Sequence, residues 1–133
     1  MYEVRVECDF SAAHFLRDYS GKCERLHGHN YKVRAYVKGH VLGECGMLLD
    51  FATLKHALAN VCGTLEHTNL NDMPVFLQNP SAERIAQYVY NELIECMKRD
   101  GYDLSYSQAK TGAYVSAIDV FETPVSRARY LPE

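Results

Sequence analysis

Hydrophobic and polar side chains alternate along residues 2–10 of the chain. The apolar positions are Tyr2, Val4, Val6, Cys8 and Phe10, and charged residues occupy the positions between them. Because successive side chains of a strand project to opposite faces, this pattern predicts a half-buried β-strand. If the alternation continues through Ala12, it places His14 on the apolar side. A second alternation runs from His29 to Val37 and ends at Gly39, so we expect the two strands to pair as a long hairpin.

Two segments with helical spacing follow the predicted hairpin. Asp50 is a suitable N-cap for a helix that starts at Phe51, and Gly63 weakens the last turns of this helix. Ser81 is the expected cap of a second helix that ends near Gly101. In both segments apolar residues recur three or four positions apart, which gathers them on one face: Phe51, Leu54, Leu58, Val61 and Leu65 in the first, and Ala82, Ile85, Ala86, Val89, Leu93 and Met97 in the second.

The last part of the chain is strand-like again. Residues 113–123 and 126–131 predict two more strands, separated by a turn at Pro124. The order ββααββ predicts a single α+β domain over residues 1–133, in which an antiparallel four-stranded sheet carries both helices on one face. Such a sheet has two open edges that invite pairing with other copies, so we expect assembly into a closed ring.

Composition and charge exclude several classes of protein. The net charge is −3 and Lys and Arg form no dense cluster, which argues against nucleic acid as the main partner. No apolar stretch is long enough to cross a membrane, and the N-terminus does not resemble a signal sequence, so a cytoplasmic location is expected. The five cysteines form no Cys-x-x-Cys pair. We therefore expect reduced thiols in a reducing compartment.

Three histidines are candidates for a metal site. His27 and His29 project to the same side of the second predicted strand, and the hairpin would bring His14 beside them. Paired histidines in strands are also ordinary core or surface residues, but a third imidazole favours a metal. Three histidines leave one position open on a tetrahedral ion, as in catalytic zinc sites. His40, at a turn, and His56, on the polar side of a helix, are expected to be solvated.

Cys23 lies one short loop before the histidine pair. Its neighbours Lys22, Glu24 and Arg25 are all charged, so a buried structural thiol is not expected there. Beside a bound cation a thiol loses its proton more easily. Cys23 is therefore a candidate base or nucleophile.

Two carboxylates are further candidates for the site. Glu66 precedes His67 at or just past the end of the first helix; the pair is either a polar helix end or a carboxylate that orients an imidazole. Glu122 follows Ile118 and Val120 on the apolar side of a strand. It is either a solvated strand end or a buried carboxylate that needs a partner. The amino-amidine edge of a pterin or guanine would supply two hydrogen-bond donors to it.

Set in order, these motifs resemble the family of 6-pyruvoyl-tetrahydropterin and 6-carboxy-tetrahydropterin synthases over nearly the whole chain. The resemblance rests on residues 10–14 (FSAAH), 23–31 (CERLHGHNY), 48–51 (LLDF), 65–71 (LEHTNLN), 79–83 (NPSAE) and 121–124 (FETP). It implies the tunnelling fold (T-fold), whose subunits join their sheets into a barrel, usually a homohexamer built as a dimer of trimers. It also implies the roles of the candidate residues: His14, His27 and His29 as Zn²⁺ ligands, Cys23 as general base, His67 with Glu66 as a proton relay, and Glu122 as the pterin anchor.

The spacing from Cys23 to His27 is similar to that of the 6-carboxy enzyme of queuosine biosynthesis. The implied reaction converts a small-molecule pterin triphosphate, 7,8-dihydroneopterin triphosphate, to 6-carboxy-5,6,7,8-tetrahydropterin with release of acetaldehyde and triphosphate. Two residues depart from this pattern: Glu66 stands where the family usually has Asp, and Glu24 creates a pattern that resembles members feeding folate synthesis. The alternatives are therefore lyases that form 6-pyruvoyl-tetrahydropterin or 6-hydroxymethyl-dihydropterin. A module that binds metal or pterin without catalysis is a third.

Overall fold

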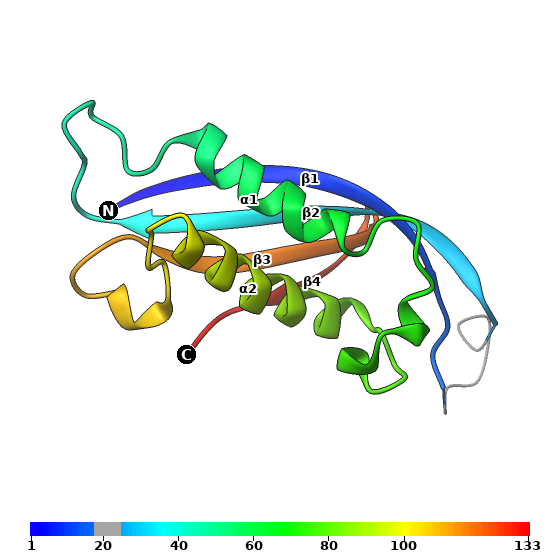
Figure 1. Cartoon of the computed structure of the whole chain (residues 1–133). Coiled ribbons are helices and arrows are strands. Elements are labelled where there is room, and N and C mark those ends of the chain that lie inside the picture. Colours follow the sequence, from blue (N-terminus) through cyan, green and yellow to red (C-terminus); the bar gives the residue numbers. More distant parts are fainter. Residues whose placement is uncertain (18–24) are drawn as a thin grey trace.

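The computed structural model describes residues 1–17 and 25–133, and the elements within them follow the expected order ββααββ (Figure 1). They are β1 (Tyr2–His14), β2 (His27–Gly39), α1 (Phe51–Gly63), α2 (Ala82–Arg99), β3 (Tyr114–Thr123) and β4 (Ser126–Tyr130). Short 3₁₀ turns at Leu70–Asp72, Pro74–Phe76 and Tyr106–Gln108 join some of them. The α+β class is confirmed. The strand positions predicted from the alternation and the helix positions predicted from helical spacing are confirmed as well.

The four strands form one antiparallel sheet in the order β1-β2-β3-β4. The β1–β2 hairpin is paired along its whole length, from Tyr2 opposite Gly39 to His14 opposite His27. Residues 67–69 run beside the far end of β1, where the amide of His67 donates to the carbonyl of Ser11 at 2.7 Å. The sheet therefore has β1 and β4 as its edges, and β1 is covered only near its end.

Both helices pack on the same face of the sheet (Figure 1), α1 mainly against β1 and α2 against β3 and β4. Asp50 caps α1 by accepting a hydrogen bond from the amide of Ala52 at 2.8 Å, and Ser81 caps α2 by accepting one from Arg84. Except for Phe51, which is 59% exposed at the start of α1, the apolar residues predicted from helical spacing lie in the layer between helices and sheet. Its largest fully buried side chains are Phe10, Tyr31, Leu54, Leu58, Leu65, Leu70, Phe76, Ile85, Leu93, Met97 and Ile118.

The other face of the sheet carries paired charges. Asp119 of β3 is only 1% exposed and accepts two hydrogen bonds from Arg129 of β4, at 2.6 and 2.9 Å. Lys32 of β2 similarly donates to Glu7 of β1 at 2.8 Å.

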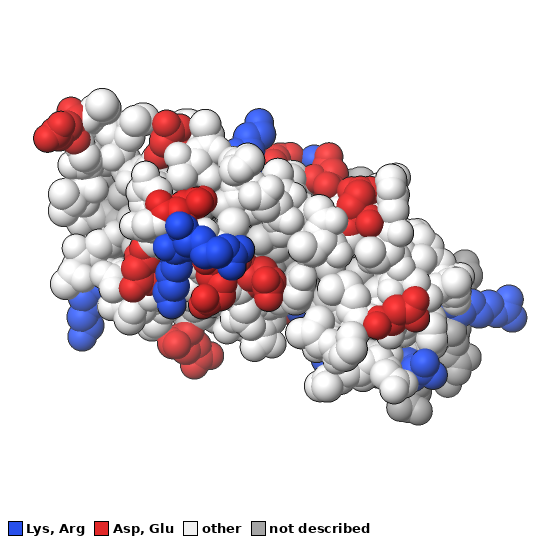
Figure 2. Space-filling model, viewed as in Figure 1, with Lys and Arg blue, Asp and Glu red and all other residues white. Residues whose placement is uncertain are grey.

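Figure 2 shows the side of the molecule on which the helices lie. Acidic and basic side chains are interspersed over this face, without a broad area of one sign on it. Of the helices in the described residues, none is both long and apolar enough to cross a membrane.

The cysteines differ in part from the expectation of reduced thiols. Cys8 of β1 and Cys62 of α1 form a disulfide between sheet and helix. The alternation places Cys8 on the half-buried side of its strand, and α1 turns Cys62 toward the same layer, so the two sulfurs meet there. Cys45 is a free exposed thiol and Cys96 a free buried one. Cys23 lies outside the described residues.

Candidate metal centre and active site

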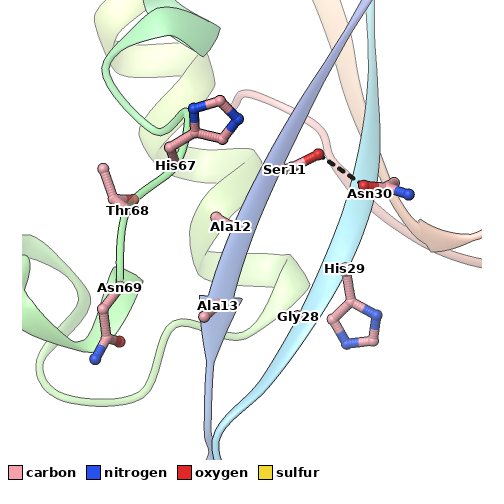
Figure 3. A pocket seen from close by; sticks show the side chains of 9 residues that line it. All are labelled: Ser11, Ala12, Ala13, Gly28, His29, Asn30, His67, Thr68 and Asn69. Atoms are coloured by element: carbon pink, nitrogen blue, oxygen red, sulfur yellow. Dashed lines mark hydrogen bonds between the residues drawn. The ribbon is translucent and has the colours of Figure 1, made fainter.

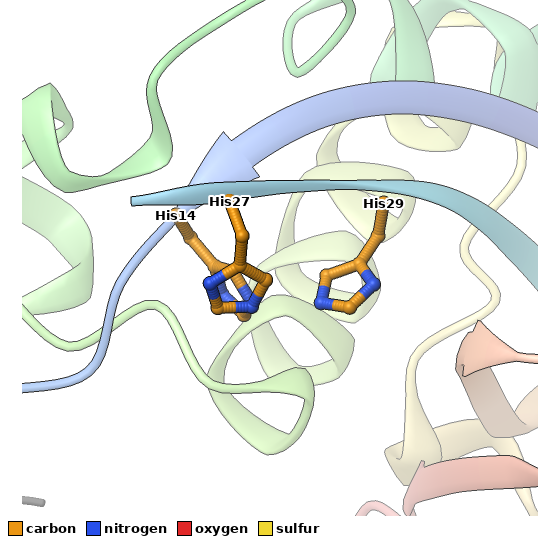
Figure 4. A group of neighbouring side chains, drawn as sticks. All are labelled: His14, His27 and His29. Carbon is orange, nitrogen blue, oxygen red and sulfur yellow. The ribbon is translucent and has the colours of Figure 1, made fainter. Parts of the chain in front are cut away.

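The hairpin brings His14, His27 and His29 together. His14 and His27 are directly opposite each other at the end of β1 and the start of β2, and His29 follows two residues later on the same side. The ring centroids of the three residues are 4.6 to 5.0 Å apart. One ring nitrogen from each lies within 4.8 Å of those of the other two. Figure 4 shows the three rings on one side of the hairpin, which is the convergence that the alternation predicts.

Backbone carbonyls orient two of these imidazoles. Nδ1 of His14 donates to the carbonyl of Pro80, just before α2, at 2.8 Å. Nδ1 of His27 donates to the carbonyl of Arg25 at 2.7 Å. A carbonyl can only accept, so the proton of each neutral ring lies on Nδ1 and the lone pair on Nε2. Metal-binding histidines are commonly held in this way, with the second ring nitrogen on a carbonyl.

Two ring nitrogens of the cluster are buried. Nε2 of His14 and of His29 has no hydrogen-bond partner among the described residues. Burial lowers the pKa of His14, although its bond to Pro80 opposes this effect, and burial also lowers the pKa of His29. Buried nitrogens without partners are costly unless a ligand fills the site. Three imidazoles whose ring nitrogens converge fit a divalent metal ion and leave one coordination position open.

The whole chain matches a known family. A model of the 6-pyruvoyl tetrahydropterin synthase family covers residues 3–133. The chain belongs to this family. A curated relative, the 6-carboxy-5,6,7,8-tetrahydropterin synthase of Synechocystis sp., is 36% identical over 135 residues, which cover 98% of this chain and 93% of the relative. A protein of the same name from Bacillus subtilis is 37% identical over 98 residues, covering 69% of this chain and 65% of the relative.

Solved structures agree with the family assignment. The structure of Caenorhabditis elegans 6-pyruvoyl tetrahydropterin synthase matches with a TM-score of 0.80 and 27% sequence identity, covering 99% of this chain and 96% of that one. The T-fold expected from the sequence is therefore the fold of this pterin synthase family member.

Glu122 lies beside the histidine cluster of this synthase family member. Its Oε1 is 3.6 Å from Nε2 of His14, and its side chain is 29% exposed, so it is half-buried. It also lines a cavity of about 250 Å³ with Ser81 and Glu83 of the α2 N-terminus and Arg127 of β4. A carboxylate that faces both the cluster and a cavity is placed to contact a ligand that extends from one to the other.

Glu66 and His67 contact each other. Oε1 of Glu66 is 3.0 Å from Nε2 of His67 and also accepts a hydrogen bond from the amide of Ser11 at 3.3 Å. The side chain of Glu66 therefore reaches the imidazole. His67 is 82% exposed, and its backbone has a positive φ of 55°. The pair forms a carboxylate–imidazole unit open to solvent at the edge of β1.

The structure does not bring the Glu66–His67 pair to the histidine cluster of the same chain. In Figure 3 the imidazole of His67 lies beside β1 and that of His29 lies beyond β2, so the hairpin separates them. Both residues nevertheless line one cavity of about 490 Å³, together with Ser11, Gly28 and Asn30. Cys23 lies outside the described residues, so its position relative to the cluster is not described. His40 and His56 are exposed, as expected.

Sequence reasoning missed two contributors to the site. The first is the carbonyl of Pro80, which orients His14; backbone groups leave no signal in a sequence. The second is Tyr31, which is fully buried with its ring edge against His14 and His29. Tyr31 continues the alternation of His27 and His29. The same alternation could therefore have indicated that its side chain lies beside the histidines.

Proposed function

We propose that this protein is a zinc-dependent lyase that converts 7,8-dihydroneopterin triphosphate to 6-carboxy-5,6,7,8-tetrahydropterin, with release of acetaldehyde and triphosphate. The observation that carries the proposal is the set of three converging imidazoles in a chain 36% identical over 98% of its length to a protein named 6-carboxy-5,6,7,8-tetrahydropterin synthase. In the cytoplasm such a product would serve queuosine biosynthesis.

His14, His27 and His29 would hold the zinc ion. When bound, the ion would supply Lewis-acid polarisation of the hydroxyl oxygens on the pterin side chain. The chain contributes the orientation of the ligands, because the carbonyls of Pro80 and Arg25 fix two of the rings before the metal arrives. The ligand set and the choice of zinc are part of the proposal.

Two groups would move protons in this mechanism. Cys23, as a thiolate next to the cation, would remove a proton from a side-chain carbon of the substrate. His67 would move the second proton, with its ring oriented and its basicity raised by Glu66 at 3.0 Å. This division of labour follows from the chemistry of the two groups, a soft thiolate and an imidazole in contact with a carboxylate.

Glu122 would anchor the pterin ring. An ionised carboxylate accepts two hydrogen bonds from an amino-amidine edge, and such charge-assisted pairs fix both position and orientation. Its place between the cluster and the 250 Å³ cavity supports this role. The ring would then lie at Glu122 and its side chain would extend toward the metal.

The active site would be shared between copies of the chain, in a homohexamer built as a dimer of trimers. His67 is exposed at the outer edge of β1 and separated from the cluster of its own chain by the hairpin. An edge is where a second copy adds its strand. His67 of one copy would thus serve the metal site of another.

The test is incubation of the zinc-loaded protein with 7,8-dihydroneopterin triphosphate, followed by mass analysis of the small products. Acetaldehyde together with the 6-carboxy product is the expected result. Formation of 6-pyruvoyl-tetrahydropterin, or of 6-hydroxymethyl-dihydropterin with a glycolaldehyde-type fragment, would replace this reaction by one of the two related lyases. Retained zinc with no release of triphosphate would mean a binding module.

A further inference from the structure

Tyr31 has a buried hydroxyl without an acceptor. Its ring stacks on Phe10 at a centroid distance of 4.7 Å and presents its side to His14 and His29 at 5.9 and 5.4 Å. The residue is fully buried, and its hydroxyl has no hydrogen-bond partner among the described residues. Buried hydroxyls are almost always bonded, because the lost contact with water is otherwise not replaced. The Tyr31 hydroxyl is therefore a hydrogen-bond donor without an acceptor among the described residues.

Glu122 has the complementary shortage. Its Oε1 lies 3.6 Å from Nε2 of His14. This distance is too long for a hydrogen bond. Among the described residues no side chain or amide donates a hydrogen bond to the Glu122 carboxylate. This carboxylate is therefore an acceptor without a donor among these residues.

The two residues are neighbours across the sheet. Lys32 of β2 is opposite Phe121 of β3, and the next residues outward from this pair are Tyr31 and Glu122. Both project to the helix-covered face, since they alternate with Lys32 and Phe121 on the open face. A phenol has an ordinary pKa of about 10, so it keeps its proton at neutral pH and can donate a hydrogen bond to an anion.

We propose that the Tyr31 hydroxyl donates a hydrogen bond to the Glu122 carboxylate and so acts as a positioning residue for the pterin anchor. Glu122 has three side-chain torsions and is half-buried, so it needs a fixed partner to present its second oxygen in one direction. Tyr31 is rigid because Phe10 and two histidines surround its ring. The hydrogen bond itself is independent of the substrate; its effect on pterin affinity rests on the proposed function.

The first test is a crystal structure of the zinc-loaded wild-type protein. The expected distance between the Tyr31 hydroxyl and a Glu122 carboxylate oxygen is about 2.6 Å, as for charge-assisted O–H···O⁻ bonds. A hydroxyl bonded to any other group, or a carboxylate turned away from it, would overturn the proposal. This result does not depend on what the protein catalyses, so it can fail while the proposed function stands.

The second test is a double-mutant cycle on binding of 7,8-dihydropterin, a ring without the reacting side chain, measured by its fluorescence. Tyr31→Phe removes only the hydroxyl and should weaken binding about tenfold or more, as expected for a bond to a charged group. In a Glu122→Ala background the same change should cost less than about twofold, because its acceptor is gone. Zinc content should stay at the wild-type level in all four proteins.

Tyr90→Phe is the matched control, because Tyr90 is a buried tyrosine of α2 that packs on Tyr130, away from the cluster. It should leave pterin affinity unchanged. Equal losses from Tyr31→Phe in the presence and absence of Glu122 would overturn the positioning role. Should the wild-type protein bind no pterin, the proposed function fails, and the crystal structure alone decides the hydrogen bond.

Discussion

Of the three histidines in the cluster, His29 is the one whose ring is not held by a backbone carbonyl of the described residues. Carbonyls hold the rings of His14 and His27, whereas the ring of His29 makes no such bond within the described residues. His29→Ala would remove one proposed ligand without disturbing a backbone contact, so it should lower zinc affinity by more than about 100-fold while the fold stays intact. Competition with a chromophoric chelator measures this change.

The control for this experiment is His56→Ala, which removes an exposed imidazole from α1. It should bind zinc as tightly as the wild type. Wild-type affinity in His29→Ala as well would remove His29 from the ligand set and leave the cluster with two members.

Cys23 carries a separate prediction, because its proposed role is to remove a proton and not to hold the metal. Cys23→Ala should lower kcat by at least about 100-fold, the usual contribution of a positioned base, and keep one zinc per chain. Steady-state kinetics and elemental analysis on the same preparation check both expectations. Cys45→Ala, which removes a free exposed thiol, should retain wild-type kcat. Full turnover in Cys23→Ala would mean that another group removes the proton.

At the scale of elements, Asp119 joins β3 to β4. Burial alone would raise the pKa of Asp119, but hydrogen bonds from Arg129 and Tyr36 and the charges of Arg129 and Arg127 outweigh it, so the pKa lies below its ordinary value of 3.8. A carboxyl with a lowered pKa in the folded state stabilises the fold above its unfolded pKa, and this contribution is lost as the pH falls through the folded value.

Asp119→Asn should therefore lower the free energy of unfolding by about 2 to 4 kcal/mol at neutral pH, because two arginines lose their buried counter-ion. The difference from wild type should stay constant above about pH 5 and shrink below about pH 4. Urea unfolding at a series of pH values measures it. Asp9→Asn, which removes an exposed carboxylate from the same face, should change stability by less than about 0.5 kcal/mol. A pH-independent difference for Asp119→Asn would contradict the assignment.

The elements were predictable because each has a strong local period. Alternation found β1 and β2 and continued far enough to place His14 beside His27, and the caps Asp50 and Ser81 located both helices. Contacts between distant segments were not predictable. No pattern in the sequence indicates that Pro80 will present its carbonyl to His14, or that Arg129 will pair with a buried Asp119.

The Cys8–Cys62 pair illustrates the same limit. The alternation placed Cys8 on the apolar side of its strand, and both residues lie in the layer between sheet and helix. Their meeting depends on how α1 is rotated over β1, which only the packed structure defines. Local periods therefore predict which face a residue occupies, and packing decides which partner it finds there.

At the scale of the whole molecule, the separation of His67 from the cluster predicts complementation between inactive variants. Cys23→Ala and His67→Ala should each be inactive alone. Coexpressed with different tags and purified as mixed oligomers, they should recover up to about a quarter of wild-type activity, since that share of sites would draw an intact residue from each of two copies. Activity no higher than in the separate variants would mean that each chain builds its own complete site.

The covering of β1 by residues 67–69 has a consequence for how copies could join. The amide of Ala13 bonds to the carbonyl of Thr68, and Ser11 accepts from His67, so the outer edge of β1 is occupied at its site end. On β1, a strand from a neighbour would find unpaired backbone on the stretch before Ser11. Residues 67–69 would therefore act as a stop that limits how far the incoming strand can slide. The same three residues that present the imidazole would also set the register of the joint between subunits.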